Sequence, residues 1–142
     1  MLDPSDIKVS FDFDSTLDRE PVQKYAKELV ERGHEVWIVT SRFGSDEKYK
    51  TFFMTTTPVG LTNEDLFRIA SEIGIPRERI HFTEMDDKWP FMKYYQEFLW
   101  HLDDDWIENK AILKNTKTKA INSLGPNWKS KCERIIKKKM LE

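Results

Sequence analysis

The chain has 142 residues, of which 39% are hydrophobic and 34% are charged, with a formal net charge of −2. This length and composition fit one folded domain and exclude a disordered chain. No apolar run approaches membrane-spanning length, and the first residues lack the features of a signal peptide, so we expect no membrane partner. One cysteine, Cys132, excludes an internal disulfide and a cysteine zinc cluster and indicates a reducing compartment, which we take to be the cytoplasm.

Charge is unevenly distributed along the chain. Residues 110–142 contain ten Lys or Arg and two Glu, a net charge of +8, so residues 1–109 carry −10. Two interpretations stay open for this basic C-terminal part. It contacts an anionic partner, or it is a solvated amphipathic end of the domain.

The first half of the chain predicts a strand, a helix and a second strand. Apolar residues alternate from Ile7 to Phe13, as in a strand. A helix is predicted to begin near Pro21 and to end at Gly33, followed by a buried parallel strand over 35–40. The segment 43–61 is predicted to be a loop or a short helix.

The second half repeats this alternation. A helix is predicted over 62–76, with Thr62 or Asn63 as its cap and Gly74 as its end. The later elements follow in order: a strand (79–82), a helix from Pro90, a strand (99–102), a helix (106–113), an edge strand (118–124) and a last helix (127–140) with Trp128, Cys132, Ile135 and Ile136 on one side.

Alternating strands and helices predict an α/β fold, a Rossmann-like three-layer sandwich with a mostly parallel central sheet, as one domain over 1–142. In such sheets ligands bind outside the carboxyl ends of the strands. The polar residues that follow the predicted strands are Asp12, Asp14, Thr40, Ser41, Arg42, the acidic loop 83–88, and Asp103, Asp104 and Asp105.

Several carboxylates at one edge repel each other unless a cation joins them. Oxygen-rich sites of this kind suit Mg²⁺. A cation beside a carboxylate, a hydroxyl and a lysine indicates phosphoryl chemistry, in which positioning and charge neutralisation supply most of the catalysis. A carboxylate can act as the nucleophile, and a second acid can protonate the leaving oxygen.

Four ordered segments resemble the motifs of the haloacid dehalogenase (HAD) superfamily of phosphohydrolases, over roughly residues 7–108. They are "FDFDSTLD", "VWIVTSR", Lys88 and "HLDDD". The chain is similar to the phosphatase domains of polynucleotide kinase/phosphatases and to nucleotidases. Ser15 departs from the pattern, because many members have Gly there. Lys88 lies fifteen residues before Asp103, and Lys93, a rival for the motif lysine, only ten.

The resemblance implies a role for each motif residue. Asp12 would be the nucleophile and a Mg²⁺ ligand, and Asp14 the general acid/base that also binds Mg²⁺ through its backbone carbonyl. Thr40 and Lys88 would complete the catalytic set, and Asp103 or Asp104 would bind the metal, with Asp105 left to cap the next helix. The expected substrate-binding residues are Thr16, Ser41 and Arg42, where Arg42 either grips a second phosphate or forms a surface ion pair.

Many members of the superfamily carry a cap domain, but only 28 positions separate Asp12 from Thr40, so we expect an enzyme without a cap. By resemblance, such members often act on macromolecules. We expect a phosphomonoesterase for a nucleotide or a nucleic-acid terminal phosphate. The alternatives are a phosphatase of a sugar phosphate or phosphoprotein, a phosphotransferase, and a non-catalytic binding or regulatory protein. An oligomer is possible but not indicated. Histidines 34, 81 and 101 and the tryptophans 37, 89, 100 and 106 are expected to be structural.

Overall fold

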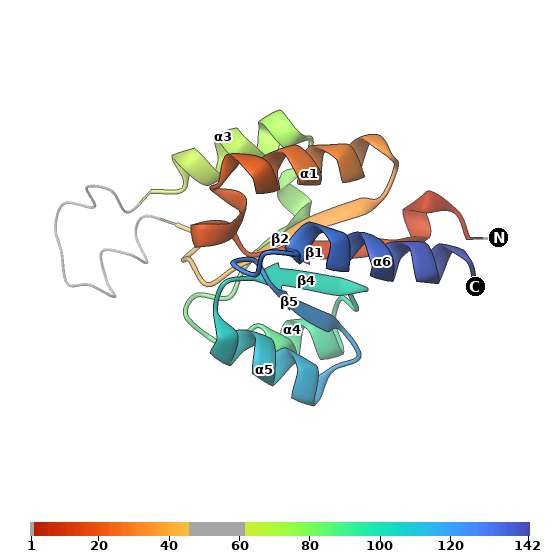
Figure 1. Ribbon diagram of the computed structural model, residues 1–142. Coiled ribbons are helices and arrows are strands. Elements are labelled where there is room, and N and C mark those ends of the chain that lie inside the picture. Colours follow the sequence, from red (N-terminus) through yellow and green to blue (C-terminus); the bar gives the residue numbers. More distant parts are fainter. Residues whose placement is uncertain (1, 46–61) are drawn as a thin grey trace, which may run out of the picture.

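The computed structural model describes residues 2–45 and 62–142 (Figure 1). Five parallel strands form one sheet in the order β3-β2-β1-β4-β5. This arrangement confirms the predicted α/β fold with a parallel central sheet. The strands are β1 (Lys8–Phe11), β2 (Glu35–Thr40), β3 (Ile80–Phe82), β4 (Trp100–Asp103) and β5 (Lys119–Asn122).

Helices cover both faces of the sheet. The first face carries α1 (Glu20–Glu31), α3 (Glu64–Ile73) and α6 (Trp128–Met140), whose apolar residues join one core cluster. The second face carries α4 (Trp89–Tyr94) and α5 (Trp106–Asn115), which pack on a smaller cluster (Figure 1). Three short turns complete the described elements: η1 (Pro4–Asp6), η2 (Phe13–Leu17) and η3 (Arg77–Arg79). No helix in the described ranges is long and apolar enough to cross a membrane.

The ends of the helices follow from local sequence signals. Pro21 lies in the first turn of α1, where its missing N–H costs nothing. Gly74 ends α3 with φ of 101°, in the left-handed region that favours glycine. Asp105 caps α5, as predicted, because its side chain accepts hydrogen bonds from the N–H groups of Ile107 and Glu108.

Several element boundaries differ from the prediction by one or two residues. The first strand ends at Phe11 rather than Phe13, because the chain turns into η2 directly after Asp12. The strand predicted over 99–102 runs one residue later and includes Asp103. Most of the predicted loop over 43–61 lies outside the described residues.

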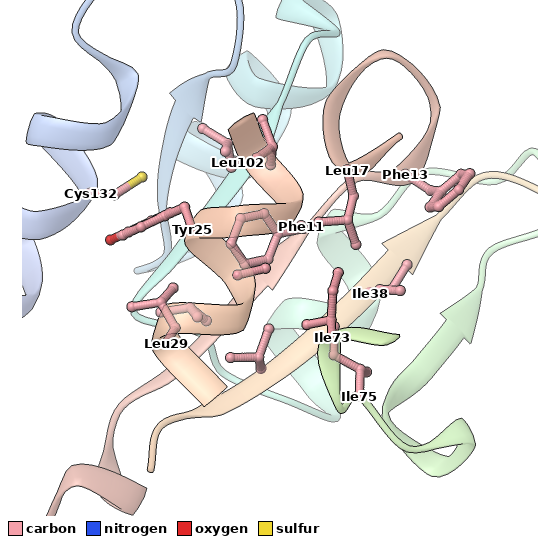
Figure 2. Close-up of a cluster of buried hydrophobic side chains, with 14 of the residues drawn as sticks. Phe11, Phe13, Leu17, Tyr25, Leu29, Ile38, Ile73, Ile75, Leu102 and Cys132 are labelled. Carbon is pink, nitrogen blue, oxygen red and sulfur yellow. The ribbon is translucent and has the colours of Figure 1, made fainter. Parts of the chain in front are cut away.

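The main core is built around three aromatic rings, and Figure 2 shows two of them, Phe11 and Tyr25, among the buried side chains. Phe11 and Trp100 meet edge to face with ring centroids 5.3 Å apart, and Tyr25 stacks on Trp100 at 6.3 Å. All three side chains are fully buried. Aromatic pairs of this geometry add about 1 kcal/mol beyond the burial of their area. They fix α1 against β1 and β4, the two strands that carry the acidic residues.

The last helix packs on this core as its apolar pattern predicted. Cys132 and Ile136 are buried, and Trp128 and Ile135 pack against the same cluster. Burial raises the pKa of the Cys132 thiol. The carboxylate of Glu133 accepts a hydrogen bond from the Tyr25 hydroxyl at 2.6 Å, which ties α6 to α1.

The sheet order places a topological switch point between β1 and β4. The chain leaves β1 toward β2 on one side, and it returns through α4 to β4 on the other side. At such a point the connections diverge and leave a crevice beyond the carboxyl ends of the strands. The first residue after β1 is Asp12, and the last residue of β4 is Asp103. The fold therefore places these two acids side by side.

Candidate functional site

An acidic cavity of about 320 Å³ lies at the switch point. Its wall contains one lysine, Lys88, and seven carboxylates: Asp12, Asp14, Asp86, Asp103, Asp104, Asp105 and Glu108. Ser41 also lines it. The cavity thus gathers most of the residues that the sequence had indicated, from the ends of β1, β2 and β4 and from the loop before α4.

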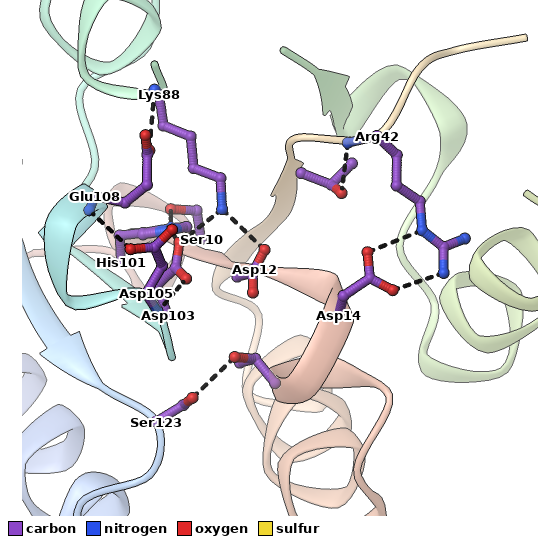
Figure 3. Close-up of polar contacts among 12 residues, drawn as sticks. Ser10, Asp12, Asp14, Arg42, Lys88, His101, Asp103, Asp105, Glu108 and Ser123 are labelled. Atoms are coloured by element: carbon purple, nitrogen blue, oxygen red, sulfur yellow. Dashed lines mark hydrogen bonds and ion pairs between the residues drawn. The ribbon is translucent and has the colours of Figure 1, made fainter. Parts of the chain in front are cut away.

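Lys88 joins the two strand-end acids (Figure 3). Its Nζ lies 2.8 Å from Oδ1 of Asp12 and 2.6 Å from Oδ2 of Asp103. The side chain is almost fully buried at the start of α4, with 2% of its surface exposed. Burial alone would lower the pKa of Lys88, but the charges of Asp12 and Asp103 raise it, so the ammonium is retained.

The same geometry separates Lys88 from its rival. Lys93 is exposed on α4, with its ammonium 5.8 Å from the Trp89 ring centroid. It does not line the acidic cavity. Of these two lysines, Lys88 is the one in contact with the acids.

Burial disfavours the ionised form of Asp12. Desolvation raises its pKa far above the ordinary value, and the charge of Asp103 raises it further, although Lys88 opposes both effects. Asp103 differs because hydrogen bonding to His101 and the charge of Lys88 lower its pKa despite burial. One lysine therefore does not balance the buried acids, and an added cation would stabilise the ionised form of Asp12.

Three carboxylates could hold such a cation. Asp12, Asp103 and Asp104 each offer an oxygen, and these oxygens all lie within 4.8 Å of one another. Hard oxygen donors of this type suit Mg²⁺, which is commonly bound by one or two carboxylates together with water. The residues present fit the predicted cofactor.

The three consecutive acids take different positions. Asp103 points into the buried network, and its Oδ1 also accepts a hydrogen bond from the N–H of Asp105 at 3.0 Å. Asp104 lines the cavity and is partly exposed. Asp105 caps α5. Of the three, Asp103 and Asp104 are thus the pair available to a metal.

His101 contacts the site, although its sequence position had indicated only a structural role. Its Nε2 lies 2.8 Å from Oδ2 of Asp103, and its Nδ1 lies 2.8 Å from Oγ of Ser10 (Figure 3). Burial lowers the pKa of His101, so the ring tends to be neutral, with one nitrogen donating and the other accepting. The signal in the sequence was its spacing: His101 and Asp103 are two apart on one strand and share a face.

Glu108 is a second residue that sequence reasoning missed. It lies in the first turn of α5, and its Oε2 accepts a hydrogen bond from the backbone N–H of Lys88 at 3.1 Å. This bond fixes the start of α4, and with it the lysine. Burial raises the pKa of Glu108.

Arg42 forms ion pairs with two carboxylates, those of Asp14 and Asp65. Its guanidinium donates two hydrogen bonds to Asp14, at 2.7 and 3.0 Å, and two to Asp65, at 2.8 and 3.0 Å. It also lies over the Phe13 ring, 4.8 Å from its centroid. The structure thus shows the ion pair that was one of the two interpretations of Arg42. It also places the Asp14 carboxylate, a predicted acid/base group, against a cation.

Two predicted threonines lie away from the cavity wall. Thr16 is buried, and its hydroxyl lies 2.8 Å from the hydroxyl of Ser123 in the loop after β5. Thr40 is buried at the end of β2, where its hydroxyl accepts the N–H of Arg42 at 3.2 Å. Neither side chain lines the acidic cavity. The observed contacts of these hydroxyls are with the loops around the site, and the predicted roles of Thr16 and Thr40 stay predictions.

The basic C-terminal part lies mainly at the other end of the sheet. Lys138 and Lys139 line a groove of about 530 Å³ together with Lys8, Lys117 and Lys119, around the beginnings of β1 and β5. The acidic cavity lies beyond the other end of β1. These lysines therefore do not border the acidic cavity.

The tryptophans differ in how far they are buried. Trp100 is fully buried, as a packing role requires. Trp106, at the first position of α5, is 68% exposed and is therefore not part of the core.

No protein-family model matches this sequence, and no curated protein matches it.

Proposed function

We propose that the chain is a Mg²⁺-dependent phosphomonoesterase that acts through an aspartyl-phosphate on a nucleotide or a nucleic-acid terminal phosphate. The observation that supports this most is the contact of Lys88 with both Asp12 and Asp103 in an acidic cavity at the switch point. The order of the motifs resembles that of HAD phosphohydrolases, and the fold is compatible with that resemblance.

In this proposal Asp12, Asp103 and Asp104 would hold the metal. When bound, it would neutralise phosphoryl oxygens and favour the ionised form of Asp12. The resemblance adds the backbone carbonyl of Asp14 as a further ligand.

The chain's own residues carry out two displacements. In the first, an Oδ atom of Asp12 forms a bond to phosphorus while the bond between phosphorus and the ester oxygen breaks, and the leaving oxygen takes a proton from the Asp14 carboxyl group. In the second, water attacks the phosphorus of the aspartyl-phosphate. The Asp14 carboxylate takes a proton from this water, and Asp12 leaves as a free carboxylate. Lys88 stays charged throughout and balances the phosphoryl oxygens.

The test is phosphate release with and without Mg²⁺. The substrates are a 3′-phosphorylated oligonucleotide, a 5′-phosphorylated oligonucleotide, mononucleotides and a sugar phosphate. We expect metal-dependent release that Asp12→Asn abolishes and Asp18→Asn preserves, because Asp18 is exposed and does not line the cavity. Activity in Asp12→Asn, or none in the natural sequence, would overturn the proposal.

One observation favours a second candidate, a non-catalytic binding protein. Arg42 occupies both carboxylate oxygens of Asp14, and Asp14 must be free to exchange protons. If this contact blocks turnover, Arg42→Met should create or raise phosphatase activity. A loss of activity in Arg42→Met would instead favour a role for Arg42 in the enzyme.

A further inference from the structure

We propose that a second cavity, next to the acidic one, binds a nucleobase that carries N–H donors, so that the substrate is a nucleotide rather than a bare sugar phosphate. This inference rests on the proposed function. The second cavity measures about 620 Å³ and lies between β3 and the start of α4. Asp86 lines both cavities. A ligand with a phosphate in the first cavity can therefore place a linked ring in the second.

Aromatic rings form one wall of this cavity. His81 and Phe91 stack with ring centroids 3.6 Å apart and an interplanar angle of 5°. Tyr95 follows, with its ring centroid 6.2 Å from that of Phe91 at an angle of 20°, and it is 77% exposed. Burial lowers the pKa of His81, so this ring is neutral near pH 7. Tyr95 is the exposed end of this stack of rings, and its ring is available to stack on a base, a contact worth about 1–3 kcal/mol.

The polar groups of the cavity indicate which hydrogen-bonding groups a bound base should carry. Asp86 and Asp87 line it, and their charges repel a phosphate but accept hydrogen bonds from N–H groups. Thr83 lines it as well. This residue is only 8% exposed, and its hydroxyl has no hydrogen-bond partner among the described residues. A buried hydroxyl without a partner costs stability, and a ligand in the cavity recovers that cost when the Thr83 side chain rotates to bring its hydroxyl to the cavity surface.

Guanine matches these groups best among the common bases. Its ring N–H and its amino group lie side by side, so that they can donate to the two oxygens of one carboxylate, and its carbonyl can accept from a hydroxyl. Hypoxanthine keeps the ring N–H but lacks the amino group. A sugar phosphate has no aromatic ring to stack.

The experiment compares kcat/KM for guanosine 5′-phosphate, inosine 5′-phosphate and ribose 5-phosphate. We expect the values to fall in that order. Tyr95→Ala and Thr83→Val should each lower kcat/KM for the guanosine ester by roughly tenfold and leave that for ribose 5-phosphate unchanged, since 1.4 kcal/mol corresponds to a factor of ten. The matched control is Tyr94→Ala, because Tyr94 directly precedes Tyr95 and is 66% exposed but does not line the cavity.

A binding measurement separates this inference from the proposed function. Guanosine, which has no phosphate, is titrated calorimetrically into the natural protein and into Tyr95→Ala. Binding that Tyr95→Ala weakens supports the base cavity even if no ester is hydrolysed, in which case only the proposed function fails. Equal kcat/KM for the nucleotide and the sugar phosphate, or no guanosine binding, would overturn the inference and leave the phosphatase proposal intact.

Discussion

The imidazole of His101 and the ammonium of Lys88 meet at one oxygen of Asp103, at 2.8 and 2.6 Å. All three side chains are buried. Asp103 Oδ2 therefore has two donors, and its Oδ1 accepts the backbone N–H of Asp105. Because every bond that Asp103 makes is fixed by a different element, its orientation is set before any ligand binds.

Replacing His101 should weaken the fold through this carboxylate. His101→Leu leaves the buried Asp103 with one donor fewer, so we expect the free energy of unfolding to fall by about 2 kcal/mol. Ser10→Ala removes only the outer hydrogen bond of the ring and should cost about 1 kcal/mol. Urea unfolding of the two variants measures both losses. Equal stability of His101→Leu and the natural protein would contradict this account.

Lys88 and Lys93 should respond very differently to the same substitution. Lys88→Met removes the ammonium from two buried acids, and breaking a buried pair in this way costs about 3–5 kcal/mol. Lys93→Met, on the exposed side of the same helix, should change stability by less than about 0.5 kcal/mol. Thermal unfolding monitored by circular dichroism compares the two. A small effect at both positions would show that the Lys88 contacts are not part of the folded state.

Asp12→Asn should stabilise the protein. Burial raises the pKa of Asp12, so the ionised carboxylate is disfavoured in the folded state near pH 7, and a neutral amide avoids this cost. The amide oxygen can still accept the hydrogen bond from Lys88. We expect a gain of about 1 kcal/mol in metal-free buffer, read as a higher Tm. Asp18→Asn should leave Tm within a degree or two of the natural protein. A lower Tm for Asp12→Asn would show that the buried Asp12 carboxylate does not destabilise the folded protein.

The contact of Glu133 with Arg32 predicts a pH dependence of stability. Hydrogen bonds from Arg32 at 2.7 and 2.8 Å lower the pKa of Glu133 in the folded state. Its stabilisation is therefore complete above the unfolded pKa of about 4.3 and is lost as pH falls through the lower folded value. Glu133→Gln should cost about 1 kcal/mol at pH 7 and almost nothing at pH 2 in urea unfolding. Glu28→Gln is the control, since its pair with Lys129 is longer, at 3.5 Å, than the two hydrogen bonds from Arg32 to Glu133. A cost that is the same at both pH values would refute the ionic contribution.

The basic groove should not affect the chemistry at the acidic cavity. Lys138→Ala with Lys139→Ala removes two charges at the far end of β1. We expect kcat/KM for a mononucleotide and for a four-nucleotide phosphorylated substrate to stay within about twofold of the natural values, because short-range contacts there cannot reach the cavity and exposed charges are screened beyond about 10 Å. A salt-dependent loss with the four-nucleotide substrate would show that nucleic acid follows a path between the two ends.

The sequence allowed the sheet and the position of the acids to be predicted because both depend on periodicity. Each strand was visible as an apolar run, and parallel strands must end at one edge, so Asp12 and Asp103 had to lie near each other. Lys88 could be chosen over Lys93 from its position before the helix. Asp105 could be assigned to the cap of α5 from its place before Trp106.

Side-chain partners could not be predicted in the same way. Arg42 follows its strand as expected, but its pairing with Asp65 depends on how α3 packs, which no local pattern encodes. Thr16 turns toward Ser123, which lies 107 positions later in the chain. The lysines of the last helix were visible as a charge run, but only the direction of α6 places them at the far end of the sheet.

Three residues that are not glycine adopt left-handed backbone angles in the described structure: Ser15 (φ 62°), Glu84 (φ 56°) and Met85 (φ 72°). Ser15 and Met85 both line the acidic cavity. Such conformations cost about 1–3 kcal/mol each and are tolerated well only by Gly, Asn and Asp. Few substitutions are therefore tolerated at these positions. A β-branched residue there would distort the wall of the cavity, although it would not touch any of the charged groups. Around the cavity, the backbone conformation therefore limits which substitutions the protein tolerates, in addition to the charged groups that its proposed chemistry needs.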